Sequence, residues 1–275
     1  MRKRPMPPLN PLNRTALALA VLALGFAAAP AAAETPEEKG LAIAEEADQR
    51  NLGFVDSTVT LKMVLTNRHG DSSTRELRLS TLEVPDPTLG DKSLTVFDHP
   101  RDIKGTAFLS FTKILEPDDQ WLYLPALKRV KRISSANKSG PFVGSEFAYE
   151  DLSSSEVAKY KYLWLRDEAC GELQCFVVEQ YPQYAESGYT RQIAWIDQDE
   201  YRIQKIEFYD RKDSLLKTMT FSDYNQYLGK HWRAHNLYVV NHQTGKSTRL
   251  TFEGFEFQVG LKERDFNANA LKRIR

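Results

Sequence analysis

The chain has 275 residues and equal numbers of cations and acids, 37 Lys and Arg residues against 37 Asp and Glu residues. Four of the cations and none of the acids lie in the first 33 residues, so residues 34–275 carry a net charge near −4. A mildly acidic chain lacks the basic footprint of nucleic-acid-binding proteins, which excludes nucleic acid as the expected partner.

The first 33 residues follow the order of a secretory signal peptide. A basic stretch is followed by an apolar run over residues 16–29 and by small residues at 31–33 that form an A-x-A cleavage site. The apolar run has 14 residues, fewer than the roughly 20 that a spanning helix needs. We expect removal of residues 1–33 and export of residues 34–275 as a soluble protein, whose length suits one large β domain or two small ones; the single domain over 34–275 is what the family resemblance below implies.

The first element expected in the exported part is a helix. Thr35 and Glu38 have the spacing of a capping box, and Pro36 stands at the first helical position. Apolar residues at helical spacing then follow, namely Leu41, Ala44 and Ala47. This periodicity predicts one helix of roughly four turns, ending near residues 51–53.

From residue 54 onward, apolar and polar residues mostly alternate, which is the period of strands. About a dozen such runs, separated by turn-forming sequences, predict antiparallel β structure in a sandwich or in an open or closed barrel. Gly254 interrupts the alternation between Phe252 and Phe255, as a β-bulge would. Several strands are apolar on both faces, which predicts either a packed core or, less commonly, a hollow for an apolar ligand.

The two cysteines and five histidines are weighed as candidate metal ligands. Cys170 and Cys175 enclose four residues that include Gly, which predicts a disulfide across a hairpin in an exported protein. His231 and His235 fall in a run that reads as a strand, where they would stand roughly 13 Å apart, too far to share a metal ion. We therefore expect no metal site. Catalytic motifs are absent from the sequence, so it supports no particular enzymatic activity, and we expect no cofactor.

The segment from residue 121 to residue 155 is the least regular part of the chain. A short strand is followed by Pro125, which restricts pairing there to a sheet edge or a bulge. Next come four cations, here called the basic block: Lys128, Arg129, Lys131 and Arg132. The remainder is rich in aromatic and acidic residues. Two interpretations stay open: a covering segment whose acids face the basic block, or a mobile lid beside a basic docking surface.

Three stretches carry a family resemblance. They are "HPRDIKGTAFLSF" (99–111), "DDQWLYLPALKRVKRISSANKSGPFVGSEFAYEDLSS" (118–155) and "TVTLKMVLTNRHGDSSTRELRLSTLEV" (58–84). In these stretches the chain resembles the outer-membrane lipoprotein-sorting protein family, exported bacterial proteins related to the carrier LolA and the receptor LolB. The resemblance implies a mainly β fold: a strongly curved antiparallel sheet, an unclosed barrel of about 11 strands, with a few helices covering the concave side.

The same resemblance implies a periplasmic, non-enzymatic carrier that holds the acyl chains of a lipid or lipoprotein. The branch in question resembles companions of RND-type (MMPL-like) exporters, which implies an inner-membrane transporter as partner and transient membrane contact. The basic block is the candidate contact with an anionic head group or with that transporter. The candidate cavity-lining residues, chosen for aromatic character, are Phe108, Phe111, Trp121, Tyr123, Phe142, Phe147, Tyr162 and Trp164. A lipid-sensing regulatory module and a structural subunit of a transport complex remain as alternatives.

Overall fold

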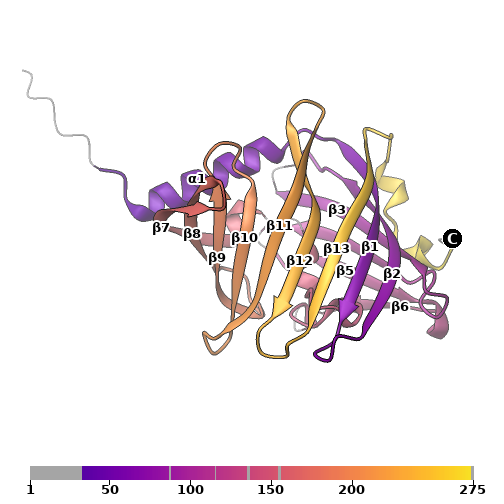
Figure 1. Cartoon of the computed structure of the whole chain (residues 1–275). Coiled ribbons are helices and arrows are strands. Elements are labelled where there is room, and N and C mark those ends of the chain that lie inside the picture. Colours follow the sequence, from indigo (N-terminus) through magenta and orange to yellow (C-terminus); the bar gives the residue numbers. More distant parts are fainter. Residues whose placement is uncertain (1–32, 87, 115, 135–136, 154–155, 274–275) are drawn as a thin grey trace, which may run out of the picture. The chain divides into compact units, whose positions relative to one another are not determined.

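The computed structural model describes residues 33–86, 88–114, 116–134, 137–153 and 156–273 (Figure 1). Residues 1–32, nearly the whole of the predicted signal peptide, lie outside the described residues. Within the described ranges, no helix is long and apolar enough to cross a membrane. The described residues from 34 onward form one compact unit.

Helix α1 (Pro36–Asn51) begins with the predicted capping box. The hydroxyl oxygen of Thr35 accepts the N–H of Glu38 (3.2 Å), and the Glu38 carboxylate accepts the N–H of Thr35 (2.8 Å). Of the predicted apolar stripe, Ala44 is buried, whereas Leu41 is 41% exposed. Gly40 and Ile43 are buried in place of Leu41, so the buried face of the helix is rotated toward them.

The strands form a single antiparallel sheet. They are β1 (Asp56–Thr66), β2 (Ser72–Leu82), β3 (Leu89–His99), β4 (Ala107–Lys113), β5 (Asp119–Leu124), β6 (Arg129–Ile133), β7 (Tyr160–Cys170), β8 (Leu173–Pro182), β9 (Tyr189–Asp197), β10 (Ile203–Asp210), β11 (Leu215–Tyr227), β12 (His231–Asn241) and β13 (Ser247–Phe257). Their spatial order is β6-β5-β4-β3-β2-β1-β13-β12-β11-β10-β9-β8-β7, so two meanders meet where β1 pairs with β13. The edge strands β6 and β7 leave the sheet unclosed, which confirms the predicted fold with 13 strands instead of about 11.

Gly254 forms the bulge that the interrupted alternation predicts. On β1, Thr58 pairs with Glu256 and Thr60 pairs with Glu253, so β13 has one residue more than its partner at this point. Gly254 has φ +67°, a conformation that glycine adopts without steric cost. The extra residue returns the following aromatic residue of β13 to the face that Phe252 occupies.

The two faces of the sheet have separate coverings. The concave face is covered at one end by α1 and elsewhere by the connection between β6 and β7 (Figure 1). The convex face of β3–β6 is covered by the C-terminal turns η6 (Glu263–Asp265) and η7 (Ala268–Arg273). Phe266 and Leu271 from this C-terminal segment are 4% and 0% exposed. A sheet covered on both sides explains why several strands are apolar on both faces.

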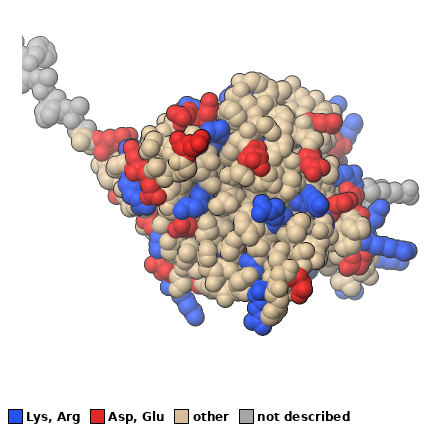
Figure 2. All heavy atoms as spheres, in the orientation of Figure 1, with Lys and Arg blue, Asp and Glu red and all other residues tan. Residues whose placement is uncertain are grey.

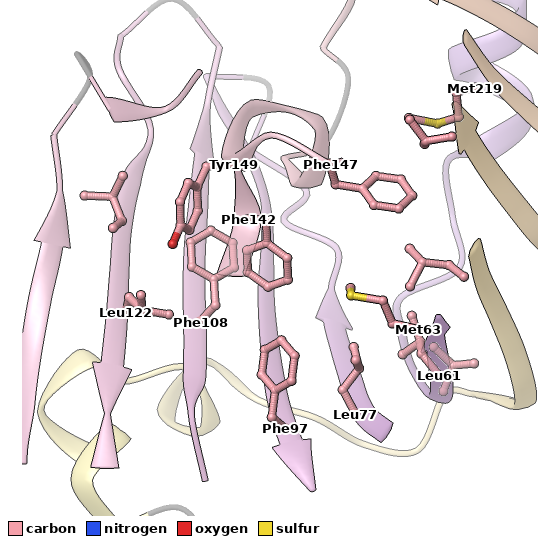
Figure 3. Packing of buried hydrophobic residues seen from close by; sticks show 14 of the residues in the cluster. Leu61, Met63, Leu77, Phe97, Phe108, Leu122, Phe142, Phe147, Tyr149 and Met219 are labelled. Carbon is pink, nitrogen blue, oxygen red and sulfur yellow. The ribbon is translucent and has the colours of Figure 1, made fainter. Parts of the chain in front are cut away.

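The connection between β6 and β7 runs from one edge of the sheet to the other. Its residues 137–153, here called the crossing segment, contain the short turns η3 (Phe142–Gly144) and η4 (Tyr149–Leu152), and η5 (Val157–Lys159) follows. Phe142 and Phe147 are each 1% exposed and point into the concave core, where Phe108 and Met63 meet them (Figure 3). The crossing segment is thus packed as a covering segment.

The hairpin of β7 and β8 carries the predicted disulfide. Cys170 and Cys175 are bonded across the β7–β8 turn, with their Cα atoms 5.9 Å apart. Cys175 is fully buried with Val177 and Trp195 in a small cluster. The prediction of a structural disulfide is confirmed.

Candidate functional site

A cavity of about 440 Å³ lies between the concave face of the sheet and the crossing segment. This volume falls within the roughly 300–1,000 Å³ of small-molecule sites. Its apolar part is lined by Leu61, Met63, Leu79, Phe147, Met219 and Leu237. The central strands and the crossing segment together enclose a hollow that can hold an apolar group.

The apolar wall follows from strand register. Leu61 lies opposite Phe252 across the β1–β13 pair, and Leu237 lies opposite Phe221 across the β11–β12 pair. Directly paired residues of neighbouring strands share one face. Because all four side chains line the cavity, the alternation along β1, β11, β12 and β13 builds a continuous apolar surface.

The other end of the cavity is polar. Lys159 and Asp118 form an ion pair of 2.9 Å between side chains that are 8% and 12% exposed. The Nζ of Lys138 lies 3.7 Å from the centre of the Tyr184 ring, and burial lowers the pKa of Lys138. Burial also raises the pKa of Asp91 to about 7. The cavity is therefore amphipathic, with an apolar wall and an end where charged and hydroxyl groups gather.

A buried ion pair anchors the crossing segment to the sheet. Lys217 on β11 and Asp151 on η4 approach to 2.5 Å, with side chains that are 3% and 2% exposed. The second oxygen of Asp151 accepts the hydroxyl of Tyr189 (2.7 Å), and Lys217 also donates to the carbonyl of Glu146 (3.0 Å). Each charge is paired and further hydrogen-bonded, as buried charges must be.

Two further acids of the crossing segment bind other strands and turns. Glu146 accepts the side-chain amide of Asn241 (2.7 Å). Glu150 accepts the N–H of Gly188 (2.8 Å) and the hydroxyl of Ser187 (2.9 Å), and burial raises its pKa. These acids face the β8–β13 side of the sheet. The interpretation in which they face the basic block on β6 is wrong.

Five of the eight candidate lining residues lie on the concave side. Phe142 and Phe147 line the cavity. Phe108 packs behind them, with its ring centre 5.3 Å from that of Phe142 (Figure 3). Tyr162 and Trp164 face the same side but are covered by α1, where they pack with Ile43 or its neighbours. Of the eight predicted candidates, only Phe142 and Phe147 line the cavity.

The other three candidates lie on the convex face. Phe111, Trp121 and Tyr123 pack with the C-terminal residues Phe266 and Leu271 and do not line the cavity. In β4 and β5 they alternate with inward-facing residues, so a shift of one position separates the two faces. The prediction that these three line the cavity is wrong.

The aliphatic lining of β1 and β11–β13 was missed as a binding surface. The run "VTLKMVL" places Leu61 and Met63 on one face, and both prove to line the cavity. Alternation identified their common face, but an aliphatic residue facing a hollow has the same sequence pattern as one facing a packed core. Leu61 and Met63 were not predicted as lining residues, because only aromatic residues were chosen as candidates.

The basic block lies outside the cavity. Lys128 ends the short turn η1 (Pro125–Leu127), and the other three cations follow on the edge strand β6. All four side chains are exposed, and Arg132 forms an ion pair with Asp119 on the neighbouring strand. The predicted exposed sheet edge is confirmed.

In the described parts of the chain, no group of three His, Cys, Asp or Glu side chains has a geometry that could hold a metal ion. The Nε2 atom of His235 instead lies 2.8 Å from the hydroxyl oxygen of Tyr227. His231 is 3% exposed and packs edge-on against Phe54. Both histidines belong to an aromatic cluster at one end of β11–β13.

Comparisons with known proteins find the same architecture in other bacterial proteins. A family model described as "Uncharacterized protein" matches residues 90–273. The crystal structure of an outer membrane lipoprotein-sorting protein domain from Vibrio parahaemolyticus is 58% identical, covering 86% of this chain and 100% of that chain with a TM-score of 0.84. A DUF1329 family protein from Desulfovibrio piger is 30% identical over 86% of this chain and 99% of that chain, with a TM-score of 0.82.

More distant similarity extends to the fold alone. A LolA superfamily protein from Nitrosomonas europaea has a TM-score of 0.66 at 20% identity, over 83% of this chain and 97% of that chain. A search of the curated proteins finds no match. The unclosed barrel is thus shared more widely than the sequence.

Proposed function

The chain belongs to the family of the Vibrio parahaemolyticus lipoprotein-sorting domain and the Desulfovibrio piger DUF1329 protein, and on this premise we propose that it is a periplasmic carrier for acyl chains. It would hold the chains of a lipid or lipoprotein in its concave cavity and pass them to or from a membrane transporter. The observation that carries the proposal is the open volume of about 440 Å³ against an apolar wall. A purely structural subunit would fill this space with its own side chains.

The energetics favour an acyl ligand. Burial of hydrocarbon stabilises a complex by about 0.8 kcal/mol per methylene group, so a 14-carbon chain gains roughly 10 kcal/mol before costs. Ordering of the chain and of nearby side chains reduces this gain. The polar end, with Lys138, Lys159 and Asp118, suits a head group that remains attached to the buried chain. Binding of this kind requires no covalent step.

Transfer to a partner is assigned to the basic block. Its cations lie on a sheet edge, outside the cavity, so a docked partner would leave the ligand in place. The partner we propose is an inner-membrane transporter of the RND or MMPL type, which would bind the basic block through an acidic surface. Replacement of Lys128, Arg129, Lys131 and Arg132 by Gln should weaken the association and flatten its salt dependence. Unchanged affinity and unchanged salt dependence would refute this docking site.

The carrier proposal is tested by native mass spectrometry and lipid extraction of protein purified from its own cell envelope. A stoichiometric lipid is expected. Absence of lipid, together with no uptake of a fluorescent fatty acid by delipidated protein, would refute the proposal. Leu237→Trp, which narrows the cavity from β12, should reduce uptake at least tenfold. Tyr238→Trp is the matched control, because Tyr238 is the next residue of β12 and lies on the opposite face.

A further inference from the structure

The end of the sheet opposite the crossing segment gathers exposed apolar side chains. Eight large hydrophobic side chains are exposed among the described residues, and four of them lie at this end. They form what is here called the apolar rim: Leu52 (41% exposed), Val55 (51%), Leu228 (52%) and Val259 (44%). Scattered single apolar residues need no explanation, but a gathered set marks an interaction surface.

Three separate connections bring the rim together. Lys230, in the β11–β12 turn, donates its Nζ to the carbonyl of Leu52 (2.8 Å), which follows α1. Asp56, at the start of β1, accepts the N–H of Val259 (2.8 Å), which follows β13. These connections meet at the top of the molecule in Figure 1. In the same orientation, Figure 2 shows a broad area without charged side chains there.

The backbone at the rim holds unfavourable conformations. Val55 has φ +72° and Leu228 has φ +52°, both in the left-handed region. Positive φ is rare for residues other than glycine, and for a β-branched residue such as valine it is a genuine outlier. Strain of this kind costs on the order of 1–3 kcal/mol per residue and is found mainly at functional sites. The chain retains bulky apolar residues at two positions that glycine or asparagine would fill without strain.

A row of stacked phenylalanines connects the rim with the cavity. The ring centre of Phe255 lies 6.0 Å from that of Phe257 and 5.7 Å from that of Phe252, with interplanar angles of 15° and 12°. Phe252 lines the cavity, and Phe257 contacts Phe54 beside the rim. The bulge at Gly254 is what keeps Phe252 and Phe255 on one face. An apolar path therefore runs along β13 from the rim to the cavity.

We propose that the apolar rim rests on a lipid bilayer and that the phenylalanine row guides the acyl chain between the bilayer and the cavity. The proposal rests on the carrier function proposed above. A bilayer is the fitting occupant because the rim consists of protruding turns with aliphatic tips, beside the cation Lys230. Such tips enter the hydrocarbon boundary while a neighbouring cation meets lipid phosphates. A continuous apolar path also spares the acyl chain exposure to water.

The test compares rim variants in two measurements. The first is flotation of delipidated protein with neutral phosphatidylcholine vesicles, and the second is the rate at which protein takes up a fluorescent fatty acid preloaded in them. Leu228→Asn is the main variant, since asparagine tolerates the left-handed backbone and keeps the turn. Its vesicle partitioning should fall about tenfold, and addition of Val259→Asn should lower it further. Leu127→Asn is the matched control, because Leu127 is 63% exposed in the turn between β5 and β6.

Equilibrium binding of the fatty acid from aqueous solution separates the two proposals. The membrane role of the apolar rim is supported if rim variants bind the fatty acid from water like the wild type, yet bind vesicles weakly and take up the fatty acid slowly from them. If the wild-type protein binds the fatty acid but does not bind vesicles, the membrane role of the apolar rim is overturned while the carrier function stands. The rim would then be assigned to a protein partner. Equal losses of vesicle binding and uptake rate in Leu228→Asn and Leu127→Asn would also overturn the membrane role of the rim. Failure of the wild type to bind the fatty acid at all would instead refute the carrier function.

Discussion

Removal of the positive charge from the buried Lys217–Asp151 pair should strongly destabilise the protein. Lys217→Met leaves the carboxylate of Asp151 buried, with the hydroxyl of Tyr189 and the N–H of Ala148 as its remaining partners. Breaking a buried pair on one side costs about 3–5 kcal/mol, because the remaining charge is uncompensated. That is a large part of the roughly 5–15 kcal/mol by which a native protein is stable.

Urea unfolding of single and double variants measures this effect. Lys217→Met combined with Asp151→Asn removes both charges, so the pair of changes should cost less than the sum of the single changes by at least about 1 kcal/mol. Hydrogen exchange at the amides of residues 142–152 should rise in Lys217→Met, since the crossing segment loses its anchor. A loss below about 1 kcal/mol for Lys217→Met, or strict additivity, would refute the anchoring role.

Gly40→Ala should lower the unfolding temperature and loosen α1, because the added Cβ would stand 2.8 Å from the backbone nitrogen of Trp164; circular dichroism and exchange of α1 amides test this, and unchanged values would contradict the close packing. Asp91→Asn should raise stability by up to about 3 kcal/mol more at pH 8 than at pH 5. The pKa of Asp91 is raised from 3.8 to about 7, so the wild type loses stability as the pH rises from about 3.8 to about 7, and asparagine avoids this loss; a pH-independent difference would contradict this. Replacing both Cys170 and Cys175 by Ser should cost about 2 kcal/mol for so short a loop and leave fatty-acid binding unchanged, since the disulfide is remote from the cavity.

The strand pattern was predictable because it is a local property. Alternation along each run gave the dozen strands, and the interruption at Gly254 gave the bulge in the β1–β13 pair, without any knowledge of neighbours. The capping box of α1 is equally local, since Thr35 and Glu38 are three residues apart. The curvature and the unclosed edge required the family resemblance, because a sandwich and a barrel have the same period.

The faces of β4 and β5 could not be assigned from the sequence. Both sides of these strands are apolar, and the C-terminal segment that covers their convex side is about 150 residues away in the chain. Trp121 was chosen as a lining residue for its aromatic side chain, yet it faces the convex cover, and its neighbour Leu122 faces the concave core. Period fixes which residues share a face, but only the tertiary partner decides which face is the inner one.

The partners of the acidic residues were also beyond local reasoning. The basic block is near Asp151 in sequence and offers four cations, whereas Lys217 is a single cation 66 residues away. Burial decides between them, because the edge strand β6 is exposed and cannot enclose an ion pair, whereas Lys217 points into the core. Proximity in sequence therefore favoured the wrong cations.

The topology bears on where an acyl chain would enter the proposed carrier. The connection containing the crossing segment is tied at one sheet edge by Ile133 and at the other by Tyr160, and it is anchored between them by the Lys217–Asp151 pair. The crossing segment is therefore held at both ends and in the middle. Moving it away from the sheet would break a buried ion pair at a cost of several kcal/mol. The apolar rim requires no such break, because the phenylalanine row already reaches it from the cavity. The less costly entrance is therefore the rim. In variants that loosen the crossing segment, such as Lys217→Met, Leu228→Asn should still slow the uptake of fatty acid from vesicles.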